Sequence, residues 1–152
     1  MNSPDPLRTL LELEALRSLK GRYCRLLDTR DFTAWRALFR DDLRVRLAIS
    51  APRPDAPPEL TYDDADEFVA RVTASLTGAA TVHHCHTPEL ALTSATTATG
   101  IWAMEDRLFY PGRHRVLGTG HYHETYVKDG DRWLIASLEL TRTYLEFVPE
   151  QG

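Results

Sequence analysis

The chain changes character at Gly78, and this change limits the folds that it can adopt. Before Gly78 the apolar residues recur at helical spacing, and after it the sequence runs in long stretches rich in Thr, Val, Ile, Trp and Tyr. Residues of these types favour strands. The predicted extended runs are 80–92, 96–110, 116–128 and 133–147, separated by turn-forming pairs at Thr93-Ser94, Pro111-Gly112 and Asp129-Gly130.

The part of the chain before Gly78 predicts three helices. A long amphipathic helix spans Leu7 to Leu27, and its charged residues, Lys20 among them, fall largely between the apolar positions. Asp31 is a suitable N-cap for a short second helix that continues through Phe39. A third helix runs from residue 62 or 63 to Leu76. Helices followed by a meander of antiparallel strands indicate an α+β fold, with the helices on one face of a bent sheet and a pocket between them.

Two further segments lie between the second and third predicted helices. Residues 43–47 alternate strictly between apolar and charged, which predicts a half-buried strand. Residues 51–58 contain four prolines, which predicts a stiff surface loop.

The composition restricts the class of protein. A chain of 152 residues is the length of one domain, and we expect the ordered part to span about 7–147. The net charge is -4 and basic residues form no stripe, so nucleic acid is not an expected partner. No apolar run is long enough to span a membrane, and the first residues do not form a secretory signal, so we expect a cytoplasmic protein. The two cysteines, Cys24 and Cys85, are interpreted as buried thiols.

Three of the six histidines are concentrated in the run from Thr81 to Leu90. Imidazole exchanges protons near neutral pH, so a strand histidine that faces a pocket is a candidate acid or base. Alternation along a strand places His83 on one face and His84 and His86 on the other. The same alternation on the later strands predicts an apolar pocket wall that suits a hydrophobic, ring-containing ligand. Its predicted members are Trp102, Met104, Tyr122, Tyr126 and Leu138.

Several motifs, taken in order, resemble the SnoaL-like branch of the NTF2-like superfamily. The resemblance covers nearly the whole chain, and it implies a cone-shaped α+β barrel in which three N-terminal helices pack in a strongly curved, mainly antiparallel sheet. The motifs are Arg22-Tyr23-Cys24-Arg25-Leu26-Leu27-Asp28, Trp35 with Leu38-Phe39, Val82-His83-His84 before Pro88-Glu89-Leu90, Gly120-His121-Tyr122, and Gly130-Asp131-Arg132-Trp133-Leu134-Ile135.

The resemblance also implies a catalytic site made of Tyr23, Asp28, His83 and Arg142. In dehydratase relatives, an aspartate orients the histidine, the histidine moves a proton next to a carbonyl, and the tyrosine polarises that carbonyl. Arg142 is expected to hold developing negative charge, and neither a metal nor an organic cofactor is required. The first strand departs from scytalone dehydratase, which offers a tyrosine where this chain has Arg44, Val45 and Arg46. Spacing along an ideal helix places Asp28 about 140° from Tyr23, so the two share a pocket only if the helix end curls.

These residues therefore predict a cofactor-independent lyase, a dehydratase or an isomerase, that acts on a hydrophobic cyclic substrate with a carbonyl. Two other functions remain open, which are polyketide ring closure by an intramolecular aldol reaction and non-catalytic binding of a hydrophobic metabolite. The apolar residues Ile101 and Ala103 on the outer sheet face predict a homodimer or homotrimer. A metal site is a further alternative, and its four candidate ligands are His84, His86, His121 and His123.

Overall fold

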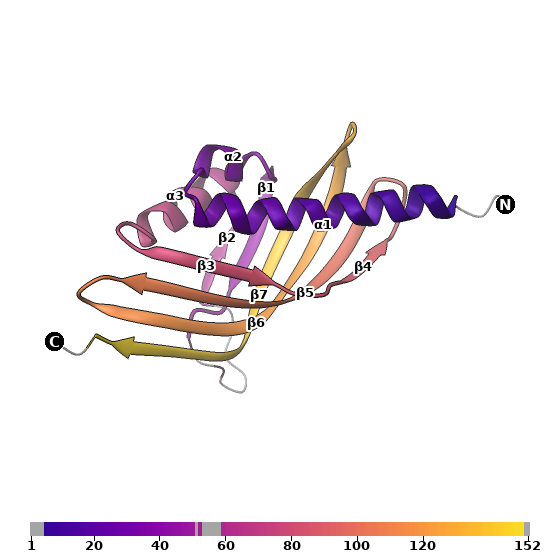
Figure 1. Cartoon of the computed structure of the whole chain (residues 1–152). Helices are drawn as coiled ribbons and strands as arrows, with labels where there is room; N and C mark the ends of the chain where they lie inside the picture. Colours follow the sequence, from indigo (N-terminus) through magenta and orange to yellow (C-terminus); the bar gives the residue numbers. More distant parts are fainter. Residues whose placement is uncertain (1–4, 51, 53–58, 151–152) are drawn as a thin grey trace.

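In the part of the chain that the structure describes, a mixed sheet of seven strands forms the framework. The structure is a computed structural model that describes residues 5–50, 52 and 59–150. Its elements are shown in Figure 1 and confirm the predicted α+β class. They are α1 (Pro6–Asp28), α2 (Phe32–Arg36), β1 (Phe39–Leu47), β2 (Leu60–Tyr62), α3 (Ala65–Ser75), β3 (Ala80–Cys85), β4 (Glu89–Leu92), β5 (Thr97–Tyr110), β6 (His114–Asp129) and β7 (Arg132–Pro149).

An aspartate caps the start of each helix. Asp5, Asp31 and Asp64 each accept a hydrogen bond from a backbone N–H in the first turn of α1, α2 and α3. Such caps satisfy donors that have no partner inside the helix. The first and third predicted helices are confirmed within a few residues, and so is the cap at Asp31. The second helix ends at Arg36 and is therefore shorter than predicted. Phe39, its predicted last residue, instead belongs to β1 and pairs with Ile135 of β7.

The sheet has the order β2-β1-β7-β6-β5-β3, with β4 also paired to β5. The hairpins β5–β6 and β6–β7 confirm the predicted antiparallel meander, whereas β1 pairs with β7 in parallel. The predicted run 80–92 is divided into β3 and β4, with Pro88, which cannot donate a ladder hydrogen bond, between them. The three-residue β2 is too short to be seen in the alternation of the sequence.

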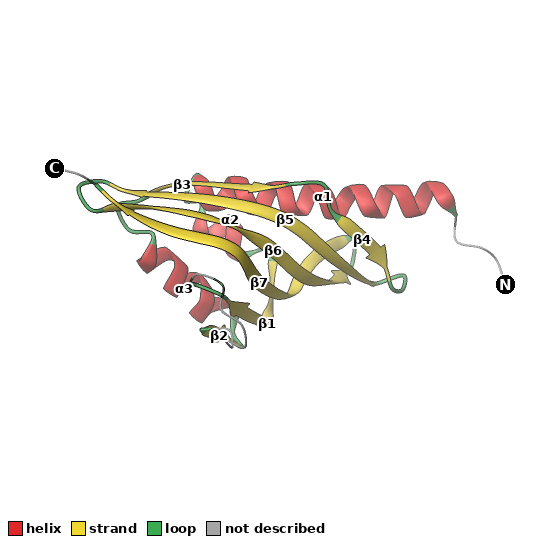
Figure 2. Ribbon diagram, turned by 90° about the horizontal axis from the view of Figure 1, so that it is seen from below, coloured by secondary structure: helices red, strands yellow, loops and turns green. Residues whose placement is uncertain are grey.

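The sheet bends around the helices but does not close. Among the described strands, β2 forms one edge, and β3 and β4, which both pair with β5, lie along the other, so the fold is an open cone rather than a complete barrel. Figure 2 shows the long strands curving away from α1, with α3 near the edge that carries β1 and β2. The strand predicted at 43–47 lies within β1, and its Leu43 and Val45 are buried. The proline-rich loop predicted at 51–58 falls outside the described residues except for Pro52.

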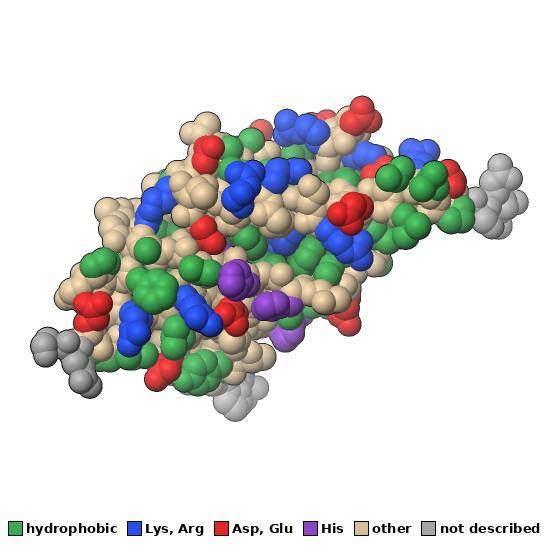
Figure 3. Space-filling view, viewed as in Figure 1, with side chains coloured by type: hydrophobic (Ala, Val, Ile, Leu, Met, Phe, Trp, Pro, Cys, Tyr) green, Lys and Arg blue, Asp and Glu red, His purple; other side chains and the backbone are tan. Residues whose placement is uncertain are grey.

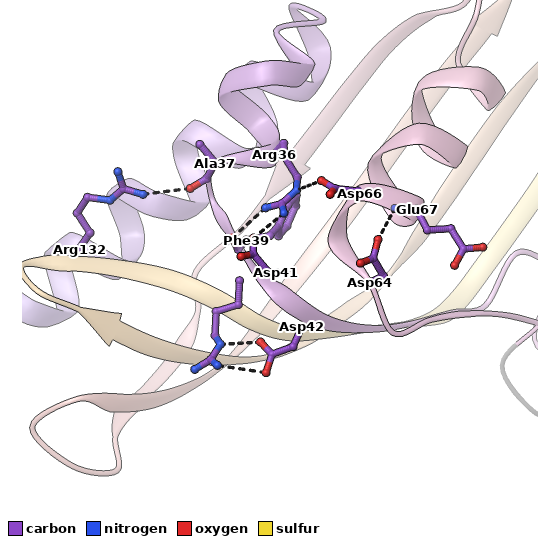
Figure 4. Close-up of polar contacts among 10 residues, drawn as sticks. Arg36, Ala37, Phe39, Asp41, Asp42, Asp64, Asp66, Glu67 and Arg132 are labelled. Carbon is purple, nitrogen blue, oxygen red and sulfur yellow. Dashed lines mark hydrogen bonds and ion pairs between the residues drawn. The ribbon is translucent and has the colours of Figure 1, made fainter.

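Arginines join the short elements at the end of the sheet, as Figure 4 shows. The Arg36 guanidinium at the end of α2 contacts Asp41 of β1 at 2.6 Å and Asp66 of α3 at 2.5 Å. Nearby, Arg40 pairs with Asp42, and Arg132 donates to the backbone oxygen of Ala37. Both aspartates that bind Arg36 are exposed, so these pairs orient the elements more than they stabilise the fold.

The described part of the chain contains no helix that is both long and apolar enough to cross a membrane.

Candidate functional site

Asp28 and His83 form a close pair between the end of α1 and the middle of β3. The Asp28 Oδ1 atom lies 2.6 Å from His83 Nδ1, and Asp28 Oδ2 accepts a hydrogen bond of 2.9 Å from the His83 backbone N–H. The hydroxyl of Thr81 donates to Asp28 Oδ1 at 2.9 Å. One carboxylate therefore binds the ring and the backbone of the same histidine. The structure brings together the two residues on which the predicted chemistry depends.

The surroundings keep the Asp28 carboxyl ionised. Burial by itself raises its pKa, but the hydrogen bonds from the His83 ring, the His83 backbone and Thr81 outweigh burial and hold the pKa below its usual value. An ionised carboxylate accepts hydrogen bonds and cannot donate them. His83 Nδ1 must therefore carry the hydrogen in this contact, and in the neutral ring Nε2 is the nitrogen that can accept a proton.

Tyr23 belongs to an aromatic cluster in the interior. Its ring packs against Trp35, Phe39 and Tyr122, with centroid distances of 5.4, 6.0 and 5.8 Å. Burial raises the pKa of Tyr23 well above its ordinary value, so its hydroxyl remains a hydrogen-bond donor at neutral pH. Asp28 instead reaches the edge strand β3. The Tyr23 ring therefore packs between α1 and the strands β1 and β6.

Arg142 is bound to Asp106 with both ends of its guanidinium. Nη1 and Nη2 each lie 2.8 Å from a separate carboxylate oxygen of Asp106, and both side chains are buried. Asp106 stands opposite His83 in the β3–β5 register, so this ion pair borders the imidazole on the same face of the sheet. Arg142, which was predicted to hold developing negative charge, therefore has its own positive charge already paired with Asp106.

The predicted pocket wall faces inward, as the alternation indicated, but it is closely packed. Its five side chains are at most 4 % exposed, and they are Trp102, Met104, Tyr122, Tyr126 and Leu138. Trp102 Nε1 donates to the Tyr126 hydroxyl at 2.8 Å, so these two residues also satisfy each other's polar atoms. In this structure the wall forms part of the protein core.

A buried ion pair between Lys20 and Glu124 was not predicted. Lys20 is 1 % exposed, its ammonium lies 2.5 Å from Glu124 Oε1, and it sits 3.9 and 3.8 Å from the ring centroids of Tyr23 and Tyr122. Lys20 is therefore an exception to the prediction that the charged residues of the first helix fall largely between its apolar positions. Position 20 follows Leu16 by four residues and precedes Tyr23 by three, so the buried stripe includes it.

The alternative metal site at four histidines does not form. Figure 3 shows histidine side chains gathered on one face of the molecule. His84 and His86 belong to the edge containing β3, whereas His121 and His123 belong to β6, and β5 runs between them. Over residues 5–50, 52 and 59–150, no group of three or more His, Cys, Asp or Glu is placed to hold a metal ion.

Four surface cavities surround this core, with volumes of about 520 to 720 Å³. None of these four is lined by Asp28 or His83. The cavity near Arg36 in Figure 4, of about 630 Å³, is lined by charged side chains, several of which pair with one another. A cavity of about 720 Å³ lies on the outer sheet face around Ile101 and Arg44. The dyad itself reaches solvent through Asp28, whose side chain is 23 % exposed.

Solved structures share this fold at low sequence identity. A candidate scytalone dehydratase from Novosphingobium aromaticivorans has a TM-score of 0.79 and 23% identity, over 91% of this chain and 88% of that chain. The hexachlorocyclohexane dehydrochlorinase LinA-type3 from Novosphingobium barchaimii has a TM-score of 0.73 and 20% identity, over 97% and 96%. The beta subunit of benzoate 1,2-dioxygenase from Burkholderia mallei has a TM-score of 0.70 and 17% identity, over 94% and 93%.

These likenesses establish the architecture, and they include proteins with different described activities. The family itself follows from a sequence match. The model of the SnoaL-like domain matches residues 8–139, which include α1, the strand with His83 and most of the sheet. The chain therefore belongs to the SnoaL-like family of the NTF2-like superfamily.

Proposed function

We propose that this protein is a lyase or isomerase that removes a proton beside the carbonyl of a hydrophobic ring substrate. The observation that carries the proposal is the 2.6 Å contact between Asp28 Oδ1 and His83 Nδ1. In this contact His83 Nδ1 donates its hydrogen to the Asp28 carboxylate, and Nε2 is left to act as the base. The names of two structural neighbours, a candidate dehydratase and a dehydrochlorinase, describe eliminations and fit this class.

The proposed reaction begins when His83 Nε2 takes the proton from the carbon next to the carbonyl. The electron pair of the broken C–H bond moves into the carbonyl and forms an enolate. In an elimination, the enolate expels a hydroxyl on the neighbouring carbon, and the imidazolium returns its proton to that group, so water leaves. Asp28 stabilises the imidazolium formed in the first step. In an isomerisation, the proton returns to a different carbon.

Tyr23 is the proposed donor to the carbonyl oxygen. Its raised pKa keeps the hydroxyl protonated, and a buried donor stabilises an enolate oxygen more than the same donor in water. Arg142 is less available for this task than expected, because Asp106 occupies both ends of its guanidinium. We therefore propose that Arg142 holds Asp106 beside His83.

Substrate binding requires the interior to open. The five wall residues are at most 4 % exposed, so a ring reaches them only when a helix moves away from the sheet. The same packing also supports the non-catalytic alternative, since a closed interior needs no substrate. Ring closure by an aldol reaction shares the first proton transfer, and its product keeps the water that an elimination releases. Assembly as a homodimer or homotrimer through the outer sheet face remains a prediction.

Proton exchange with solvent tests the proposal without knowledge of the true substrate. A panel of one- and two-ring hydroxyketones is incubated in D₂O, and deuterium next to the carbonyl is followed by mass spectrometry. We expect His83→Ala to slow exchange by about 10²- to 10⁴-fold. His84→Ala is the matched control, because His84 is exposed on the opposite face of the same strand. Equal exchange by the wild type and His83→Ala contradicts the proposal, and binding without exchange favours the non-catalytic alternative.

A further inference from the structure

Cys24 of α1 and Cys85 of β3 face each other across the interface between the helix and the sheet. Their Sγ atoms are 3.6 Å apart although the residues are 61 positions apart in sequence. Both are free thiols, and both are partly buried rather than fully enclosed. The interpretation of the two cysteines as separate buried thiols therefore misses their contact.

We propose that Cys24 and Cys85 form an oxidation site that closes to a disulfide when the protein meets a hydroperoxide. The Cys24 thiolate attacks one peroxide oxygen, the O–O bond breaks, and Cys24 becomes a sulfenic acid while hydroxide leaves. The Cys85 sulfur then attacks Cys24, the S–O bond breaks, and water leaves. With hydrogen peroxide, two thiols and one peroxide give one disulfide and two waters. The proposal does not depend on the function proposed above.

The surrounding contacts favour this bridge. A disulfide needs the sulfurs about 2.05 Å apart, so they must approach by about 1.5 Å. Asp28, one helical turn after Cys24, is already bound to His83, two residues before Cys85. The backbones of α1 and β3 are thus held together beside the two thiols, and small side-chain rotations can provide the approach.

The pKa values of the two thiols are shifted in opposite directions, which separates the sulfur that attacks the peroxide from the sulfur that closes the bridge. The hydrogen bond with Cys85 lowers the pKa of Cys24, and the nearby Lys20 ammonium acts in the same direction against burial. The pKa of Cys85 is raised by the same contact with Cys24 and by burial. Thiolate is the form that attacks peroxides, so Cys24 is the first sulfur to react and Cys85 the second.

The test uses the full chain treated with a small excess of hydrogen peroxide and then analysed without reductant. We expect the intact mass to fall by two hydrogens, both thiols to disappear from a thiol titration, and one peptide pair to contain Cys24 linked to Cys85. The melting temperature should rise by roughly 4–10 °C and return after dithiothreitol, because the bridge restricts the unfolded chain.

Three variants serve as controls. Cys24→Ser and Cys85→Ser should show no internal bridge and no reversible rise in melting temperature. The double variant Cys24→Ser/Cys85→Ser shows whether the fold survives without the thiols. Free dithiothreitol treated in parallel serves as the reference dithiol. If both protein thiols persist when the peroxide has fully oxidised the dithiothreitol, the proposal is overturned. Oxygen adducts without the loss of two hydrogens, or cross-linked dimers in place of the internal bridge, would overturn it as well.

Discussion

Two aspartates lie on either side of His83, and they have opposite characters. Asp28 comes from the end of α1, is 23 % exposed at its side chain, and binds an imidazole. Asp106 comes from β5, is 6 % exposed, and binds the guanidinium of Arg142 with both oxygens. A guanidinium is not a practical proton donor or acceptor in proteins, whereas imidazole is the side-chain type that serves as a general acid or base. Only the Asp28 pair can therefore take part in proton transfer, and the Asp106 pair is suited to hold the structure.

The largest effect should come from breaking the Asp106 pair. Arg142→Met leaves the Asp106 carboxylate buried without its cation, and we expect a loss of about 3–5 kcal/mol in the free energy of unfolding. Urea unfolding measures it. The double variant Arg142→Met/Asp106→Leu should recover most of the loss, since it removes both charges. A loss of about 0.5 kcal/mol or less, which is typical of an exposed surface site, would contradict the structural role of the pair.

The Asp106–Arg142 pair can also be disturbed by a substitution on the neighbouring strand β6. Gly118 lies on β6 opposite Asp106, and a Cβ there would collide with the Asp106 carboxylate and the Arg142 guanidinium. Gly118→Ala should therefore destabilise the protein by about 1–3 kcal/mol, as overpacking does. Gly21→Ala is the matched control, because a Cβ at Gly21 meets no atom within 4 Å, and in a helix it should stabilise by about 0.5–1 kcal/mol. Equal melting temperatures for wild type and Gly118→Ala would show that the pair relaxes easily.

Breaking the Asp28 pair should have a smaller effect that depends on pH. The pKa of Asp28 is lowered in the folded state, so its contribution to stability is complete above the unfolded pKa and is lost as pH falls through the folded pKa. Asp28→Asn should cost about 1–2 kcal/mol at pH 7, since charged hydrogen bonds are removed. The difference from wild type should shrink below about pH 4. If the difference in unfolding free energy between wild type and Asp28→Asn is the same at every pH from 3 to 7, an ionised Asp28 is excluded as its cause.

The smallest effect should come from Thr81, which supports Asp28 from β3. Thr81→Val removes a hydroxyl that donates to Asp28 Oδ1 at 2.9 Å, and we expect a loss of about 0.5–1.5 kcal/mol in the free energy of unfolding at neutral pH. The pKa of Asp28 should rise, which an NMR titration of its carboxyl carbon measures. Thr119→Val is the control, because the Thr119 hydroxyl contacts Thr143 at an exposed position away from Asp28. An unchanged Asp28 pKa in Thr81→Val would mean that His83 alone sets it.

Periodicity along the chain was enough to predict the elements and the inward residues. The spacing of Leu16, Leu19 and Tyr23 predicts the buried stripe of α1, and alternation predicts that Trp102 and Tyr122 face the helices. Both patterns are local, so they need no knowledge of which strands pair. The proximity of Asp28 and His83 came from the family resemblance, since nothing in the helical spacing required it.

Contacts that depend on register and helix placement were beyond the sequence. The pairing of Asp106 with Arg142 requires the registers of two strand pairs, and the contact of Cys24 with Cys85 requires the position of α1 over β3. The parallel pairing of β1 with β7 joins residues that are far apart in the chain, such as Phe39 with Ile135, and local patterns carry no signal for it. The burial of Lys20 follows from its position on the apolar stripe of α1, although its charge groups it with the residues that fall between the apolar positions.

The two contacts of Asp28 with His83 fix the orientation of the imidazole, which is the proposed base. Because one carboxylate holds the main chain and the ring of a single residue, turning the imidazole would pull against an anchor fixed to its own backbone. The direction of Nε2 is thus set before a ligand binds. The imidazole keeps this direction as long as the end of α1 and the edge strand β3 stay in contact. If the interior opens at another place, a ligand can enter without a change in the orientation of the His83 imidazole.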